Sequence, residues 1–368
     1  MRRPRRGDQC DIGLFSTRPA APSGPRGTGQ GVEEAHRRVG GLGGPMPGKA
    51  MVFAPIPLLS VTVDTREEMP DIRLRAEGPG CRQTRVLAAF GVSTVLCGCF
   101  GGESGPVLRQ LLAEEGIECR AVRRPGRNGT RVREQGAGTM RTVAESPGDP
   151  LTPQEADRLR AAALEAGARA DVCVLTQEAD PAAVPPGLYR GLTGDLRARG
   201  VRVVAALSGE ALAAALTGGV DVLCLDQRRL PVGPGGHAAH AGVGDLVAAM
   251  RRLRSRGAGT VVLRRAERPA LVLIGEDVVA VPAPVPPGGT AAAGLCGDRL
   301  IAAIAAGLAT GLPEEDAVRL GVAAGTPHSD RPEAPSGMDP ETARQLAGRV
   351  ELHEPALEET PGGSGAFW

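Results

Sequence analysis

Short apolar runs rich in β-branched residues alternate with Ala-, Leu- and Arg-rich stretches along most of this chain. The strand-like runs cover residues 94–97, 171–175, 201–205, 220–224 and 260–263. The helical stretches cover residues 105–115, 152–166, 188–199, 209–216 and 244–256. Because strands of a parallel sheet are buried on both faces, they read as continuous apolar runs separated by helices. The alternation therefore predicts a three-layer α/β/α fold, with a mostly parallel central sheet between two layers of helices.

Two stretches, at about residues 60–77 and 118–146, break this alternation. Both alternate polar and apolar residues one by one, as in Asp71-Ile-Arg-Leu-Arg75 and Cys119-Arg-Ala-Val-Arg123. A period of two is typical of strands with one face in solvent. We expect short antiparallel strands here that form a small β lid over the edge of the central sheet.

The two ends of the chain differ in composition from its middle. Residues 1–50 are rich in Arg, Gly and Pro without a sustained period, which predicts a disordered N-terminal extension. A native start at Met46 or Met51 is an alternative interpretation, because the first strand-like run begins there. Residues 353–368 are polar and Gly-rich, and we expect a flexible tail. Residues 51–352 remain for one folded domain with a substantial core.

Composition argues against several classes of partner. The formal net charge is +1, so no general field attracts nucleic acid or an anionic membrane. One Trp, one Tyr and five Phe leave few aromatic faces on which single-stranded bases could stack. No apolar run is long enough to span a bilayer, and the basic N-terminus lacks the apolar segment of a signal peptide. We expect a cytoplasmic protein with neither a nucleic-acid nor a membrane partner.

Eight cysteines are present, and several stand inside apolar runs, as in residues 172–175 and 222–225. We expect buried free thiols in a reducing compartment. The chain has no Cys-x-x-Cys pair, and His237 and His240 share a Gly-rich stretch with no third ligand nearby. No residue is therefore expected to hold a structural metal.

A glycine turn, Gly294-Leu-Cys-Gly-Asp-Arg299, leads directly into the apolar stretch 300–308. It delivers one acidic residue, Asp298, to the start of a helix. Free backbone N–H groups and the positive end of the helix dipole attract a phosphate there. A carboxylate beside that phosphate can take the proton from an attacking hydroxyl. The turn therefore favours phosphoryl transfer, with Asp298 as the candidate base.

Two further glycine segments precede predicted helices in the same way: Glu77-Gly-Pro-Gly-Cys-Arg82 and Gly98-Cys-Phe-Gly-Gly-Glu-Ser-Gly105. Strand–helix junctions of this kind carry ligands in α/β proteins. A single glycine motif more often serves a tight turn, so the order and spacing of the three segments are more informative than any one of them.

Together these motifs resemble those of the ribokinase-like, PfkB-type sugar kinases, particularly the 1-phosphofructokinase branch. The resemblance covers about residues 51–352, and it is carried by residues 101–105, 207–212, 297–298 and 307–325. It implies a ribokinase-like domain with a β lid, and transfer of the ATP γ-phosphate to a hydroxyl of a sugar or sugar phosphate. Mg²⁺ would neutralise charge on the nucleotide phosphates. A homodimer through the lid is left open.

The resemblance also implies roles for individual residues. Asp298 falls on the family's catalytic base. The residues of the anion hole, whose N–H groups would hold the transferring phosphoryl group, are Leu295, Cys296 and Gly297. The residues implied in substrate binding are Ser60, Gly80 and Arg82. The residues implied near the nucleotide are Asp226, Arg264 and Ala266, with a one-residue ambiguity of register at the last two.

Several positions depart from the family's pattern. Leu295 stands where the family's Gly-Ala-Gly-Asp begins, at a point where a positive φ could be needed. Pro79 removes the family's lysine and a backbone donor, and Arg82 replaces a sugar-binding asparagine. Ser60 replaces a sugar-binding aspartate. Arg229 reverses the sign of an acid that helps to organise Mg²⁺ and phosphate in the family.

These departures leave alternatives open. Arg82, Arg264 and Arg265 suit bidentate binding of phosphates, or they are solvated surface arginines. The favoured interpretation is a carbohydrate kinase. The alternative is a catalytically impaired paralogue that binds nucleotide or sugar phosphate as a regulator. A nucleoside kinase on the same fold is disfavoured by the scarcity of aromatic residues for holding a base.

Overall fold

The structure is a computed structural model that describes residues 48–66, 69–136, 139–176, 180–231, 241–266, 268–284, 296–326 and 338–355. The predictions for residues 1–47 and 356–368 lie outside these residues, as do those for His237, His240 and Leu295. All described residues belong to one compact unit.

The central layer, as far as the chain is described, is a nine-stranded sheet with the order β13-β12-β11-β10-β9-β8-β1-β4-β5. The strands from β11 to β5 are parallel to their neighbours, and β12 and β13 add an antiparallel edge. The predicted, mostly parallel sheet is therefore confirmed. The strands are β1 (Lys49–Phe53), β4 (Ser93–Gly101), β5 (Glu118–Arg124), β8 (Val172–Thr176), β9 (Arg202–Ala206), β10 (Val220–Asp226), β11 (Ala258–Arg264), β12 (Ala270–Ile274) and β13 (Asp277–Val281).

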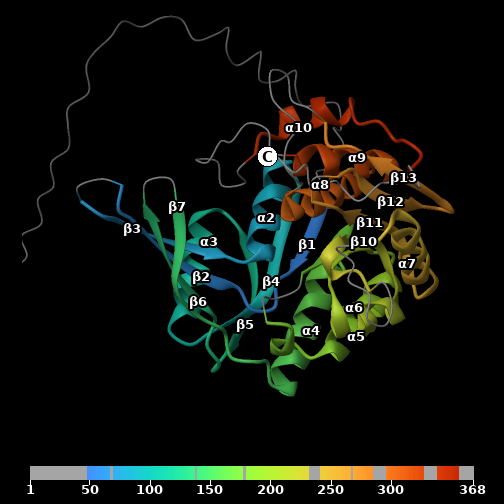
Figure 1. Cartoon of the computed structure of the whole chain (residues 1–368). Coiled ribbons are helices and arrows are strands. Elements are labelled where there is room, and N and C mark those ends of the chain that lie inside the picture. Colours follow the sequence, from blue (N-terminus) through green and yellow to red (C-terminus); the bar gives the residue numbers. More distant parts are fainter. Residues whose placement is uncertain are drawn as a thin grey trace, which may run out of the picture. The chain divides into compact units, whose positions relative to one another are not determined.

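Helices cover both faces of this sheet (Figure 1). Successive side chains of a strand point to opposite faces, so Met51 and Phe53 enter one apolar core while Ala50 and Val52 enter the other. The helices on the first face are α4 (Pro153–Gly167), α5 (Pro186–Arg197), α6 (Gly209–Gly218) and α7 (Val243–Ser255). The second layer is made of α2 (Pro79–Ala89), α3 (Ser104–Glu114), α8 (Gly297–Ala309), α9 (Glu314–Gly325) and α10 (Pro340–Ala347). No described helix has both the length and the apolar character needed to cross a membrane.

A second sheet of four strands, in the order β3-β2-β6-β7, corresponds to the predicted lid; we call it the small sheet. Its strands are β2 (Leu58–Asp64), β3 (Asp71–Glu77), β6 (Thr130–Gly136) and β7 (Thr139–Ser146). The pairs β2–β3 and β6–β7 are antiparallel as expected, whereas β2 and β6 are parallel.

The lid prediction was wrong for residues 118–124. These residues form β5, which pairs with β4 in parallel at the edge of the central sheet. An edge strand also exposes alternate polar side chains, so it gives the same period of two as a lid strand. The ends of the domain also differ from the prediction. The first strand begins at Lys49, before residue 51, and His353 exchanges backbone hydrogen bonds with Ala280 of β13.

The expected buried thiols are found where the chain is described. Cys97, Cys99, Cys173 and Cys224 are buried and not in disulfides, whereas Cys296 is exposed. Burial raises the pKa of the Cys173 and Cys224 thiols to about 12. These buried thiols are therefore poor nucleophiles at neutral pH.

Candidate active site

A cavity of about 590 Å³ lies at the carboxyl ends of the parallel strands; we call it the strand-end cavity. The last residues of four neighbouring strands line it: Thr176 of β8, Ala206 of β9, Asp226 of β10 and Arg264 of β11. The first turn of α8 closes one side. Ligands of open α/β sheets bind at this edge, because the carboxyl ends of parallel strands meet there.

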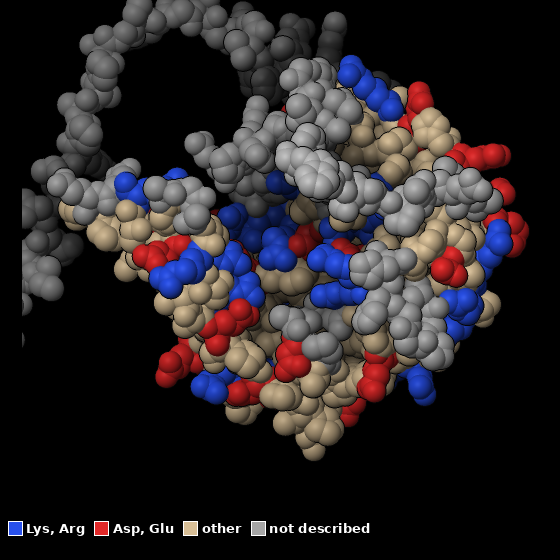
Figure 2. Space-filling view, viewed as in Figure 1, with Lys and Arg blue, Asp and Glu red and all other residues tan. Residues whose placement is uncertain are grey.

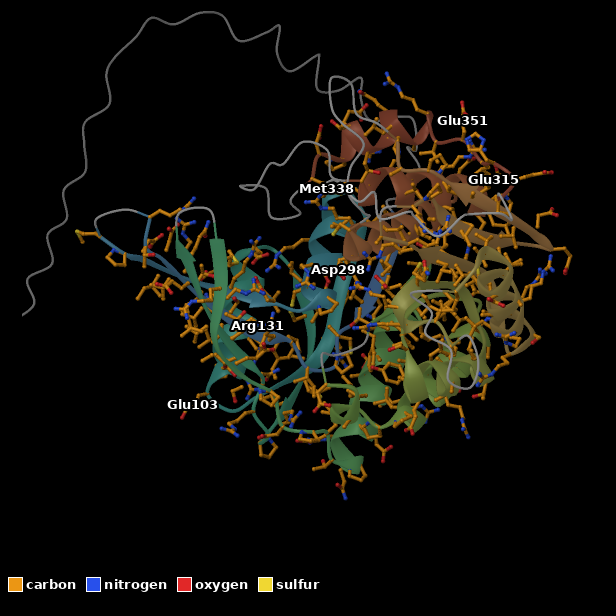
Figure 3. All side chains as sticks on the ribbon, in the orientation of Figure 1. Glu103, Arg131, Asp298, Glu315, Met338 and Glu351 are labelled. Atoms are coloured by element: carbon orange, nitrogen blue, oxygen red, sulfur yellow. The ribbon has the colours of Figure 1, made fainter. Side chains whose placement is uncertain are left out.

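Helix α8 fixes Asp298 at this edge. Every residue from Leu300 to Ala309 is buried. A Cβ on Gly321 of α9 would lie 2.4 Å from Cγ1 of Ile304, so the two helices pack in close contact. Asp298, in the first turn, keeps 20% of its side chain exposed. Figure 3 labels Asp298 at this end of α8 and Arg131 across from it on the small sheet.

Two neighbouring residues of α2 hold the Asp298 carboxylate. Nε of Arg82 donates to Oδ2 at 2.6 Å, and Nε2 of Gln83 donates to Oδ1 at 3.1 Å. Gln83 is fully buried, so its contact with Oδ1 is held by the packing around it. The arrangement fixes the carboxylate plane at the start of α8.

The first turn of α8 offers backbone donors beside Asp298. The N–H groups that open a helix have no intrahelical acceptor, and no side chain of the described residues caps this helix. Cys296 differs from the prediction, because its N–H donates to the carbonyl oxygen of Gly325 at 2.7 Å. Gly325 is the last residue of α9, where a carbonyl needs an external donor. In this structure the N–H of Cys296 is therefore not free to hold a phosphate.

Arginines dominate the charge of the strand-end cavity. Its described lining contains Arg82, Arg228, Arg229 and Arg264, against the carboxylates of Asp226 and Asp298. Figure 2 shows Lys and Arg side chains gathered near the centre of this face around a few acidic atoms. A cavity of this charge suits a polyanionic ligand.

Asp226 belongs to an ion-pair cluster at the end of β10. Its carboxylate accepts from Nη2 of Arg264 at 2.6 Å and from Nε of Arg228 at 2.9 Å. Burial alone would raise the pKa of Asp226, but hydrogen bonds from Arg228 and the charge of Arg264 bring it below its ordinary value. Asp226 therefore stays charged and holds Arg264 against the cavity.

Within the described part of the chain, the residues form no site that would hold magnesium by protein ligands alone. Mg²⁺ prefers carboxylate and water oxygens in an octahedral arrangement. Among the described residues no group of three or more His, Cys, Asp or Glu could hold a metal. The two carboxylates of the strand-end cavity, Asp226 and Asp298, are already paired with arginines.

A second cavity, of about 510 Å³, lies against the small sheet; we call it the small-sheet cavity. Arg131 of β6 and Glu145 of β7 line it and form a bidentate pair, with N···O distances of 3.0 and 2.7 Å. The hydrogen bond from Arg131 lowers the pKa of Glu145. Arg82 and Arg229 line both cavities, so the two spaces adjoin.

The remaining predicted residues lie around these cavities without lining them. Ser60 pairs in register with Arg131, and its buried Oγ has no hydrogen-bond partner in the described part of the chain. Gly80 packs against Ala54, and Ala266 is exposed beyond the end of β11. Arg265 fits neither interpretation made for it, because it is 2% exposed and its Nε donates to the carbonyl oxygen of Pro269.

Sequence reasoning missed Gln83, Arg131 and Glu145 as site residues. Gln83 follows Arg82 directly, and only the helical geometry shows that both reach Asp298. Arg131 and Glu145 meet because β6 and β7 pair across a hairpin whose register shifts between Val132 and Arg133. Their types and spacing alone carried no signal of this pairing.

Comparisons with known proteins give a family, sequence relatives and solved structures of similar fold. Residues 50–327 match the family described as pfkB family carbohydrate kinase. The chain is 27% identical over 252 residues to 1-phosphofructokinase of Bacillus subtilis (strain 168), covering 68% of this chain and 80% of that protein. Phosphofructokinase-2 from Escherichia coli, solved with potassium, has a TM-score of 0.67 and 22% identity, covering 82% of this chain and 99% of that one. Ribokinase from Arabidopsis thaliana, solved with ribose and ATP, has a TM-score of 0.58 and 17% identity, covering 82% and 99%. The family match includes the parallel strands, α2 and the turn that carries Asp298, and the chain belongs to the pfkB family of carbohydrate kinases.

Proposed function

We propose that this chain transfers the γ-phosphoryl group of ATP to a hydroxyl of a sugar or sugar phosphate, as a hexose kinase similar to 1-phosphofructokinase. The observation that carries the proposal is the position of Asp298. It stands at the start of α8 inside the strand-end cavity, and its partner Arg82 also lines the small-sheet cavity. The nucleotide occupies the strand-end cavity, and the acceptor occupies the small-sheet cavity.

Asp298 acts as the general base in this proposal. Its carboxylate takes the proton of the acceptor hydroxyl as that oxygen attacks the γ-phosphorus. The N–H groups and the positive end of α8 stabilise the phosphoryl oxygens. A Cβ at Gly297 would lie 3.5 Å from Nε of Arg264, so Arg264 stands beside the same turn.

ATP is the proposed donor because the family consists of kinases and a fold relative is solved with ATP. Mg²⁺ enters as the counter-ion of the nucleotide, held by its phosphates and not by carboxylates of this chain. Asp226, Arg264 and Ala266 are proposed to flank the nucleotide. Ser60, Gly80 and Arg82 are proposed to flank the acceptor, and the similarity to 1-phosphofructokinase favours a phosphorylated hexose.

A homodimer through the small sheet is also proposed. Ile72 and Leu74 of β3 are 64% and 47% exposed, and they pair in register with Val63 and Val61 of β2. This apolar stripe on one face of a sheet suits a second copy of the chain. Light scattering on the wild type and on Leu74→Asp tests the proposal, and a monomeric wild type would refute it.

A cytoplasmic location completes the proposal. ATP and sugar phosphates are cytoplasmic metabolites, and the buried cysteines are free thiols, as in a reducing compartment. Fractionation of cells that express the tagged protein tests this, and recovery from the membrane or the medium would contradict it.

The decisive experiment uses purified protein, ATP with Mg²⁺, and an acceptor panel that includes fructose 1-phosphate, fructose 6-phosphate and unphosphorylated hexoses. We expect turnover with at least one acceptor, and a fall in kcat of about 10²- to 10⁴-fold in Asp298→Asn. Absence of turnover with the whole panel, or full activity of Asp298→Asn, would refute the proposal.

One observation favours the alternative of an impaired paralogue. Both oxygens of Asp298 accept hydrogen bonds from α2, and the N–H of Cys296 is bound to Gly325. In that case ATP or a sugar phosphate would raise the melting temperature of the protein while no product formed. The thermal shift and the product assay, run on the same sample, separate the two functions.

A further inference from the structure

Two arginines stand at the boundary between the cavities. Arg82 comes from the start of α2, and Arg229 ends the short turn Gln227–Arg229 that follows β10. They are the charged residues that line both cavities within the described part of the chain. If the donor and acceptor occupy the two cavities, the group that passes between them crosses this boundary.

The contact between Arg82 and Asp298 places Arg82 beside the proposed base. Nε of Arg82 lies 2.6 Å from Oδ2 of the base. An acceptor hydroxyl would lie about 3 Å from the same carboxylate, and the phosphorus it attacks about 3–3.5 Å beyond. An acceptor on the Arg82 side of this carboxylate brings the transferring phosphoryl oxygens within hydrogen-bond reach of the Nη groups of Arg82.

The exposure and the hydrogen bonding of the two guanidinium groups suit a phosphoryl group bound at this boundary. Arg82 keeps 45% of its side chain exposed, and it bonds Asp298 through Nε, which leaves both Nη groups without a partner among the described residues. Arg229 is exposed, and none of the described residues forms an ion pair or hydrogen bond with its side chain. Its neighbour Arg228 is instead paired with Asp226.

We propose that Arg82 and Arg229 are catalytic residues that clamp the transferring phosphoryl group from two sides; this rests on the proposed function. A bond forms between the acceptor oxygen and the γ-phosphorus while the bond to the bridging oxygen of ADP breaks. The acceptor proton goes to Asp298, and ADP leaves with the electron pair of the broken bond. Arg82 moves its hydrogen bond from Oδ2 of Asp298 to a phosphoryl oxygen, which opens Oδ2 to the acceptor hydroxyl.

The clamp also suits the described residues, among which no cluster of carboxylates could hold a metal. Negative charge spreads over the phosphoryl oxygens in the transition state and needs a fixed positive partner. Arginine stays protonated in proteins, and its planar fork matches two phosphoryl oxygens. Two such guanidinium groups neutralise part of the negative charge of the transition state, a task that a protein-held cation would otherwise perform.

The test compares Arg82→Gln, Arg229→Gln and the matched Lys variants with the wild type. Each Gln variant should lower kcat about 10- to 100-fold, the equivalent of one charge-assisted hydrogen bond, while both KM values change less than about 3-fold. The Lys variants should recover part of kcat, because they keep the charge and lose the fork. Arg120→Gln is the control, since Arg120 forms an exposed ion pair with Glu165 on β5 and α4 and should retain wild-type kcat.

A second measurement needs neither turnover nor a known acceptor. ADP with Mg²⁺ and aluminium fluoride mimics the transferring phosphoryl group. It should raise the melting temperature of the wild type more than ADP with Mg²⁺ alone. Both Gln variants should keep the ADP shift and lose the additional one.

The outcomes separate this inference from the proposed function. A wild type that turns over no acceptor refutes the proposed function, and the fluoride measurement still tests the clamp. Gln variants with wild-type kcat, or with losses confined to KM, overturn the clamp while the kinase stands. Equal thermal shifts with and without aluminium fluoride in the wild type also overturn it.

Discussion

One methyl group added at Gly80 should shift α2 relative to the central sheet. Gly80 lies in the first turn of α2, and a Cβ placed there would be 2.3 Å from Cβ of Ala54. Carbon atoms that are not bonded make contact at about 3.5–4.0 Å, so Gly80→Ala must displace the start of α2 by about 1 Å or more. Overpacking of a core in this way costs about 1–3 kcal/mol. We expect Gly80→Ala to lower the free energy of unfolding by that amount.

The displacement should also reach the base. Arg82 and Gln83 follow Gly80 on the same helix, and their bonds to Asp298 are 2.6 and 3.1 Å long. A shift of about 1 Å takes both beyond hydrogen-bond distance and misplaces Gln83 and the Arg82 guanidinium relative to the carboxylate, so kcat should fall in parallel with stability. Unfolding in urea, followed by circular dichroism, gives the stability, and steady-state kinetics give kcat on the same preparations.

The variant Ala54→Gly/Gly80→Ala supplies the rescue, because it removes the atom that the new methyl would meet. It should recover stability and kcat relative to Gly80→Ala alone. Gly187→Ala in α5 is the matched control, since a Cβ there meets nothing within 4 Å, and it should stabilise by about 0.5–1 kcal/mol. If the double variant recovered stability while its KM for the acceptor still differed from that of the wild type, the result would indicate that Gly80 contacts the substrate. A Gly80→Ala protein as stable as the wild type would refute the packing argument itself.

Three further outcomes follow from burial and charge. Glu155→Ala leaves the buried Arg124 without its carboxylate, which lies 3.4 Å from Nε, and should destabilise by about 3–5 kcal/mol in urea unfolding. Hydrogen bonds from Arg66 lower the pKa of Asp64 to about 2, so its stabilising effect is complete above its ordinary pKa of 3.8 and is lost as the pH falls toward 2. Arg66→Gln should flatten the pH dependence of the urea midpoint between pH 5 and 2, and an unchanged slope would contradict this. Burial raises the pKa of the Cys224 thiol to about 12, so the native protein at pH 8 should leave Cys224 unmodified by iodoacetamide in peptide mass spectra.

The fold could be predicted where the period of the apolar residues and the length of the apolar run indicate the same kind of element. The apolar runs that became β8, β9, β10 and β11 are buried on both faces, and that burial requires both continuous apolar sequence and helices on each side. The prediction failed at β5, because an edge strand and a lid strand share one pattern. Which sheet a strand joins depends on pairing partners distant in sequence, and the local pattern carries no record of them.

The candidate site could be proposed from the sequence at Asp298 but not around it. Asp298 was singled out because an acid after a glycine turn and before an apolar helix is a local signal, and the structure places it beside the strand-end cavity. Arg264 and Arg265 are adjacent and identical in type, yet one lines the cavity and the other is buried, since successive side chains leave the strand end in opposite directions. The contact of Arg82 with Asp298 joins residues 216 positions apart, so it depends on the packing of α2 beside α8.

Three of the five departures from the family pattern lie at one place in the described structure. Pro79, Arg82 and Arg229 each looked like a loss in the sequence, and these three are the residues that line both cavities in the described structure. Random decay of an unused site would strike the base and its supports as readily as their neighbours. Here Asp298 accepts hydrogen bonds from Gln83 and from the substituted Arg82, and α8 packs closely against α9. Three changes gathered at the boundary, with Asp298 still at the start of α8, suit a site rebuilt around its arginines. The concentration of these three changes at one point is an argument for a remodelled kinase, and the paired thermal-shift and product assays decide between it and an impaired one.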